Sequence, residues 1–224
     1  MQSFEDLGVA PEIAEALAAE GIEFATPLQE AAIPVVRKGN NLLIESGPGA
    51  GVLVAWAGGL LERIEAKGQS PAALVLCASR EGADRLAEST ARMAASTELR
   101  VAALGSSWVM PERAHLLFAT PEDALTALAG GSLTPSEVAA VVVDQAQLIE
   151  QFQVDFRNLA ATVVAQDLVD ICQGVILLCA ICPVGGTVEG LAGVQMIERE
   201  LALRQAELDS PGQNRGWQSE TGKS

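Results

Sequence analysis

The segment from Ser46 to Leu53 is rich in glycine and lies between an apolar run and a helix-like stretch. In loops of this kind, backbone N–H groups cradle phosphate oxygens, a lysine reaches the β- and γ-phosphates, and a serine or threonine hydroxyl holds Mg²⁺. Val52 and Leu53 stand where that lysine and that hydroxyl would be needed. Gly49 and Gly51 remain before the helix, whose N-terminus stabilises an anion by about 0.3–1 kcal/mol. We therefore expect weak anion binding here at most.

A polar pair, Asp144-Gln145, follows the apolar run Ala139–Val143. The Asp144 carboxylate is a weak candidate for contact with Mg²⁺. The Gln145 amide can hydrogen-bond an attacking water but cannot accept its proton, and the loss of a general base costs about 10²–10⁴-fold in rate. Together with Val52 and Leu53, this pair predicts that hydrolysis of a bound triphosphate falls to background.

The elements that must position these residues alternate along the chain. Strand candidates rich in Val, Leu, Ile and Ala span Asn41–Glu45, Ala72–Cys77, Arg100–Leu104, His115–Ala119, Ala139–Val143 and Val175–Ala180. Helix candidates span Pro11–Glu20, Pro27–Arg37, Leu53–Ala66, Glu81–Ala95, Pro121–Ala129 and Val194–Glu207. Near-continuous apolar strands are typical of a parallel sheet that is buried on both faces. The alternation predicts a doubly wound α/β domain, with ligands at the carboxyl ends of the strands.

A longer pattern precedes the first strand: Phe4, then Gly21, then Thr26-Pro27-Leu28-Gln29. A glutamine amide donates and accepts hydrogen bonds at once, as an adenine edge requires. The whole pattern resembles the Q motif of DEAD-box RNA helicases, in which the glutamine reads the adenine of ATP. The isolated aromatic stands upstream of the glycine at the spacing that the family uses.

Further motifs of that family follow in its order, each at the end of a predicted strand. They are Cys77–Glu81 (similar to motif Ia), Gly105-Ser106, Ala119–Asp123 (motif Ib), Asp144–Gln147 (motif II) and Cys179–Ile181 (motif III). The resemblance covers residues 4–195 and is stronger up to Asp144. It implies a three-layer RecA-like P-loop NTPase fold, with a mainly parallel sheet and helices on both faces.

The resemblance also assigns ancestral roles to particular residues. Nucleotide contacts would come from Phe4, Gln29, Gly47, Gly49, Ala50, Gly51, Val52 and Leu53, and Mg²⁺ would contact Asp144. Nucleic-acid contacts would come from Ser79, Arg80, Thr120 and Pro121. We expect ATP with Mg²⁺ to bind weakly or not at all, because the chain departs from the family at the lysine, hydroxyl and glutamate positions.

The expected nucleic-acid contacts are also depleted. The family's Thr-Pro-Gly-Arg is replaced by Thr120-Pro121-Glu122-Asp123, so that two acids stand in place of a glycine and a phosphate-pairing arginine. Arg80 is retained and could still contact a phosphate. In the family, ATP and RNA bind across a cleft between two RecA-like domains, and we expect no complete site from one such domain.

The net charge of the chain also argues against strong nucleic-acid binding. The chain has 29 acidic and 14 basic residues, for a net charge of −15. Such a surface repels phosphate backbones over a Debye length of about 10 Å at 0.1 M salt. Many acids with few lysines are typical of a protein from a salt-rich source, although an ordinary acidic cytosolic protein has the same balance.

The remaining expectations concern organisation. Residues 1–40 would be Q-motif helices of the same domain, 41–208 the RecA-like core, and 209–224 a disordered polar tail. We expect a cytoplasmic chain without a membrane span, since no apolar run approaches about 20 residues. We expect Trp56 in the core, His115 exposed or capping, and no zinc at the Cys179–Cys182 pair, because a second pair is lacking.

Three functions follow. The first is a helicase-like protein that has lost hydrolysis and unwinding and binds RNA or nucleotide weakly. The second is a protein-interaction scaffold with neither ligand. The third is a residual ATPase completed by a partner that supplies the second domain.

Overall fold

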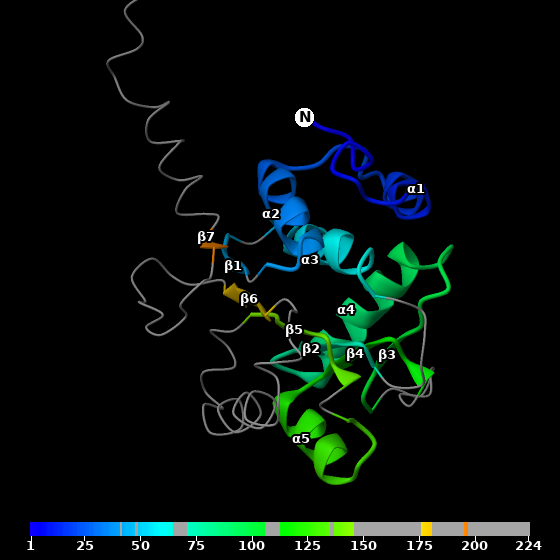
Figure 1. Cartoon of the computed structure of the whole chain (residues 1–224), viewed down its shortest axis with the longest axis vertical. Coiled ribbons are helices and arrows are strands. Elements are labelled where there is room, and N and C mark those ends of the chain that lie inside the picture. Colours follow the sequence, from blue (N-terminus) through cyan, green and yellow to red (C-terminus); the bar gives the residue numbers. More distant parts are fainter. Residues whose placement is uncertain are drawn as a thin grey trace, which may run out of the picture.

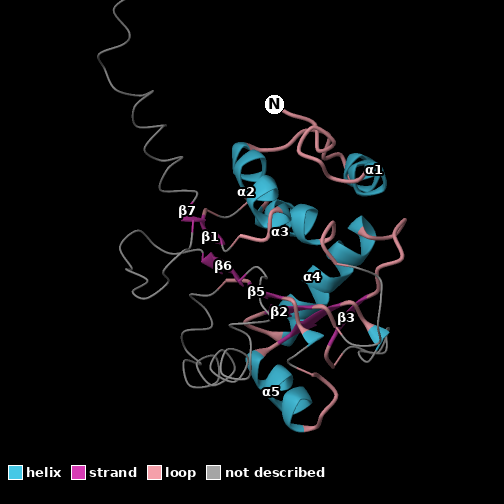
Figure 2. Ribbon diagram, in the orientation of Figure 1, coloured by secondary structure: helices cyan, strands magenta, loops and turns pink. Residues whose placement is uncertain are grey.

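The protein is seen here in a computed structural model, which describes residues 1–40, 42–47, 49–64, 71–105, 113–134 and 137–145, and the backbone of 176–180 and 195–196. Its helices are α1 (Pro11–Ala19), α2 (Pro27–Arg37), α3 (Val52–Leu60), α4 (Arg80–Met93) and α5 (Pro121–Ala129). Its strands are β1 (Leu42–Glu45), β2 (Ala73–Leu76), β3 (Val101–Ala103), β4 (Leu116–Ala119), β5 (Ala140–Val143), β6 (Ile176–Ala180) and β7 (Gln195–Met196). Figures 1 and 2 show their arrangement.

The strands form one sheet in the order β3-β4-β2-β5-β6-β1-β7. Each neighbouring pair is parallel, including the central pairs of β2 with β4 and β5. Helices α1 to α4 lie on one side of this sheet and α5 lies on the other (Figure 1). The predicted three-layer α/β fold with a parallel sheet and helices on both faces is confirmed.

Alternate strand residues pack into different cores. Val75, Phe118 and Val142 belong to the cluster that includes the side chains of α1 to α4. Leu74 and Leu117 belong to the cluster under α5. This explains why the strands read as continuous apolar runs, since both faces of the sheet are covered. The first cluster also holds buried residues from 1–40, so these helices share a core with the sheet.

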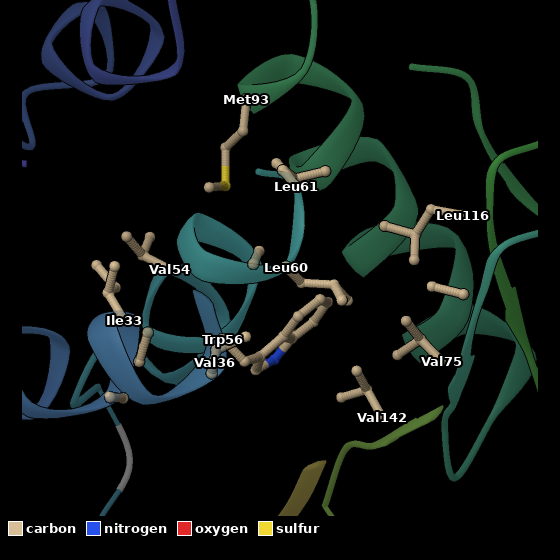
Figure 3. Close-up of a cluster of buried hydrophobic side chains, with 14 of the residues drawn as sticks. Ile33, Val36, Val54, Trp56, Leu60, Leu61, Val75, Met93, Leu116 and Val142 are labelled. Atoms are coloured by element: carbon tan, nitrogen blue, oxygen red, sulfur yellow. The ribbon is translucent and has the colours of Figure 1, made fainter. Parts of the chain in front are cut away.

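Helix α3 lies deep in the first cluster, against α2 (Figure 3). Trp56 is fully buried there, as predicted, and its ring centroid is 6.2 Å from that of Phe118. Gly59 allows the close approach of α2, because a Cβ at this position would lie 2.7 Å from the Cβ of Val36.

Polar side chains define where several helices begin. Thr26 accepts a hydrogen bond from the backbone N–H of Gln29, and the Gln29 side chain accepts one from the backbone of Thr26, which completes a capping box at α2. Ser79 and Thr120 cap α4 and α5 in the same position. These local signals explain why α2 and α5 begin at their predicted residues.

Helices α1 and α4 differ from their predicted bounds by one or two residues, and two further predicted helices differ by more. The helix expected at Leu53–Ala66 spans Val52–Leu60, and a turn follows in which Arg63 and Ile64 both donate backbone N–H groups to the carbonyl of Leu60. The helix expected at Val194–Glu207 is wrong at its start, because Gln195 and Met196 form a strand. These two residues pair in parallel with Leu42 and Leu43. Such pairing with a distant strand leaves no periodic signal in so short a segment.

His115 corrects another expectation, because it is buried at 1% exposure rather than exposed or capping. It precedes β4, and its Nδ1 accepts a hydrogen bond of 3.1 Å from the backbone N–H of Arg100, while its Nε2 lies 2.8 Å from Arg100 Nη2. The imidazole therefore accepts a hydrogen bond from the backbone next to β3 instead of facing solvent.

Other expectations lie outside the described residues. They include the tail 209–224, the end of the core at 208, and Cys182. In the part of the chain that is described, no helix is long and apolar enough to cross a membrane.

Candidate functional site

Most of the candidate residues lie along one edge of the sheet. Parallel strands end on the same side, and the segments that hold most candidate residues follow β1, β2, β4 and β5 there: 46–53, 79–80, 120–123 and 144–145. Helix α2 adds Gln29, which bonds to the first of these segments. This edge is where ligands of doubly wound sheets bind.

The loop before α3 has glycines in left-handed conformations and no cationic side chain. Gly49 and Gly51 have φ angles of +83° and +78°, which favour glycine, and Gly51 is the N-cap of α3 without a side-chain hydrogen bond. Val52 and Leu53 are half-buried against the hydrophobic core. The helix start therefore offers N–H groups but no ammonium or hydroxyl.

Two of the groups that hold a metal-bound triphosphate are missing from this loop. The buried Ser46 hydroxyl at the start of the loop has no hydrogen-bond partner among the described residues, so one polar group does remain. However, Val52 and Leu53 supply neither charge nor a metal ligand, and a helix terminus alone is worth only about 0.3–1 kcal/mol. In the described residues, no group of three His, Cys, Asp or Glu side chains could hold a metal ion.

Gln29 uses its side-chain amide within the protein. Its Nε2 donates to the carbonyl of Gly51 at 3.1 Å, and its Oε1 accepts from the backbone N–H of Thr26 at 2.9 Å. The residue is 2% exposed, and the Thr26 hydroxyl donates to the carbonyl of Ala50 at 3.4 Å. Gln29 therefore ties the backbone of the loop before α3 to α2.

Phe4, the other aromatic member of the expected nucleotide site, is buried at 2% exposure in the core beside α1 and α2. Its carbonyl accepts hydrogen bonds from the backbone N–H groups of Leu7 and Val9.

Phe24 is 55% exposed, and among the described residues only it and Met1 are large hydrophobics on the surface. Its place two residues before the Thr26 cap gave no sign of this in the sequence.

Asp144 and Gln145 stand immediately after β5. Asp144 is 9% exposed, and burial raises the pKa of its carboxyl to about 6, although the positive charge of Arg85 opposes this shift. The neighbouring Cys77 thiol also has a raised pKa, because it is buried and lies near the Asp144 charge. Gln145 has a φ of 52°, a left-handed conformation that is uncommon for a residue with a side chain.

The expected nucleic-acid residues have structural partners. Ser79 accepts from the backbone N–H of Gly82 at 3.1 Å, and Thr120 accepts from that of Asp123 at 3.2 Å. Pro121 is buried in the first turn of α5. Ser79, Thr120 and Pro121 thus account for helix starts without any ligand.

Arg80 is joined to Asp123, 43 positions away. Its Nε donates to Asp123 Oδ2 at 2.8 Å, and its Nη2 donates to Oδ1. The Thr120 hydroxyl donates to the same carboxylate at 2.8 Å. The Arg80 guanidinium, with help from Thr120, holds the pKa of Asp123 below its usual range. Both residues were visible in the sequence, but their pairing was not.

Comparison with known proteins supplies a family. The family model described as DEAD/DEAH box helicase matches residues 26–180. The DEAD-box ATP-dependent RNA helicase CshA of Geobacillus kaustophilus is 25% identical over 153 residues, which cover 65% of this chain and 33% of that protein. The ATP-dependent RNA helicase DbpA of Escherichia coli is 31% identical over 129 residues, which cover 54% and 28%. The chain spans about a third of the length of such curated relatives.

Solved structures agree on the fold. The RNA helicase Prp28 from Chaetomium thermophilum, bound to ADP, matches with a TM-score of 0.71 at 17% identity, over 93% of this chain and 57% of that one. A DEAD box protein from Methanococcus jannaschii matches with a TM-score of 0.68 at 19% identity, over 92% of this chain and 53% of that one.

Proposed function

Because the chain belongs to the DEAD/DEAH box helicase family, we propose that it is a member that has lost ATP hydrolysis and unwinding and that acts by binding. The start of α3 carries this proposal. There Val52 and Leu53 pack half-buried against the core, in the positions where a lysine and a hydroxyl would hold the phosphates and the metal.

The surroundings of Asp144 support the same conclusion. Its neighbour Gln145 has no basic group with which to take a proton from water. A bound triphosphate would therefore lack a cationic lysine. Its metal would lack a hydroxyl ligand, and the attacking water would lack a general base.

The test is saturable binding of a fluorescent ATP analogue with Mg²⁺, in low salt and in molar KCl. The natural chain is compared with Val52→Lys/Leu53→Thr, which restores both missing groups, and with Val52→Leu/Leu53→Val as the matched apolar control. We expect binding by the restored variant alone. ATP hydrolysis by the natural chain above background, with or without added RNA, and abolished by Asp144→Ala, would show that the proposal is wrong.

A second candidate is a scaffold that binds protein and neither nucleotide nor RNA. Two observations favour it: the Gln29 amide is hydrogen-bonded to Thr26 and Gly51, and Arg80 is paired with Asp123. It predicts that RNA fails to bind at low salt, where contacts between basic side chains and phosphates are screened least, and also in molar KCl, where repulsion by the acidic surface is screened. Salt-sensitive RNA binding by the natural chain would exclude it.

A further inference from the structure

The N-termini of two helices and one exposed arginine meet at the carboxyl edge of β2, β3 and β4. Arg80 is the first residue of α4, and its side chain is 68% exposed. Asp123 lies in the first turn of α5, and its side chain is only 15% exposed. A Cβ added at Gly105, just after β3, would lie 3.9 Å from Arg80 Cδ, so the arginine side chain also lies beside the end of that strand.

The Asp123 carboxylate occupies the arginine in the geometry that a phosphate would use. Guanidinium groups bind carboxylates and phosphates alike through two parallel N–H···O bonds. Here Nε and Nη2 of Arg80 both donate to Asp123, and the Thr120 hydroxyl donates to Oδ2 as a third partner. A phosphate of a nucleic-acid strand at this edge can bind Arg80 in the same way only if it displaces the Asp123 carboxylate.

The neighbouring charged residues do not replace the positive charge of Arg80 that Asp123 neutralises. Glu81 and Glu122 are both exposed and stand beside the paired residues in the sequence. With Arg80 neutralised by Asp123, the exposed side chains of these two helix starts carry net negative charge. Among the described residues of these two helix starts, only the backbone N–H groups still favour an anion.

We propose that the Arg80–Asp123 pair is an autoinhibitory contact, in which a carboxylate of α5 competes with the phosphates of a nucleic-acid strand for Arg80. This inference rests on the proposed binding role, and it concerns phosphate backbone rather than nucleotide. It also separates two roles of the acids in α5. Glu122 serves the helix start as a first-turn acid, whereas Asp123 serves it and blocks the arginine as well.

The experiment measures fluorescence anisotropy of a short labelled oligouridylate at low salt, without nucleotide. The variant Asp123→Asn removes the competing charge and retains the backbone N–H that bonds to Thr120. The matched control is Glu122→Gln, which removes the same charge one residue away and leaves Arg80 paired. Thermal unfolding of each variant verifies that it is folded.

We expect Asp123→Asn to tighten binding by about tenfold or more, as for a gained hydrogen bond between charged groups. Glu122→Gln should give about threefold or less, since it changes only exposed charge. Addition of Arg80→Ala to Asp123→Asn should abolish the gain. Equal effects of the two single variants, or a gain that persists without Arg80, would overturn the inference. Tight binding by the natural chain that Arg80→Ala weakens would overturn it as well. None of these outcomes depends on ATP, so failure here is distinct from failure of the proposed loss of hydrolysis.

Discussion

Asp144 carries its carboxyl where burial opposes ionisation. The side chain stands at the end of β5, in the same region as the buried Cys77 thiol. Its pKa is about 6 against an ordinary value of 3.8, so the folded protein binds more protons than the unfolded chain between these values. Stability is therefore lost as the pH rises from about 4 to about 6, and the penalty persists above that range.

At the residue scale, Asp144→Asn should remove this penalty. In metal-free buffer we expect the variant to be more stable than the natural chain at pH 8, by on the order of 3 kcal/mol, since one pKa unit corresponds to about 1.4 kcal/mol. The difference should shrink as the pH falls toward 4. Urea unfolding across this range measures it, and a difference that does not change with pH would contradict the raised pKa.

At the element scale, the packing of α3 on α2 depends on one of two adjacent glycines. A Cβ at Gly59 would lie 2.7 Å from the Cβ of Val36 and 2.8 Å from the carbonyl oxygen of Ile33. A Cβ at Gly58 would meet nothing closer than Ile33 Cδ1 at 3.4 Å, which is an ordinary contact. Gly59 is therefore required by packing, and Gly58 is not.

Gly59→Ala should destabilise the protein by about 1–3 kcal/mol, because α2 must move away from α3. Gly58→Ala is the matched control, and we expect it to be neutral or to stabilise by up to about 1 kcal/mol through helix propensity. The urea midpoints of the two variants decide the matter. Similar effects of both substitutions would mean that the two helices are not in such close contact.

At the scale of the whole molecule, the net charge of −15 makes electrostatic repulsion an important influence on stability. Exposed acids lie on helices at opposite ends of the described chain, among them Glu12, Glu15, Glu81, Glu88 and Glu122. Arg92 pairs with Glu20 and Glu88, but bases are too few to pair with most of the acids. Mutual repulsion at low ionic strength should therefore weaken the folded state.

We expect the thermal midpoint to rise by roughly 5 °C or more between low salt and molar KCl, which corresponds to about 1–2 kcal/mol for a domain of this size. Glycerol at the same osmolality is the control for effects other than screening, and it should raise the midpoint less. A midpoint that is unchanged or lower in KCl would contradict both the repulsion and the expectation of a salt-rich source.

The sequence alone determined the order of the main elements, because its signals are local. Apolar runs marked β1 to β6 to within one or two residues, and caps such as Thr26 and Thr120 marked where α2 and α5 begin. It also indicated the missing chemistry at Val52, Leu53 and Gln145, since residue type by itself decides whether a group can carry charge or accept a proton.

Only the tertiary structure decided which groups are occupied. The pairing of Arg80 with Asp123, the bond from Gln29 to Gly51 and the burial of His115 beside Arg100 each join residues 15 or more positions apart. The strand at Gln195–Met196 likewise exists through its pairing with β1. A side chain's partner depends on which strands and helices become neighbours in the sheet, and local sequence does not encode that distance.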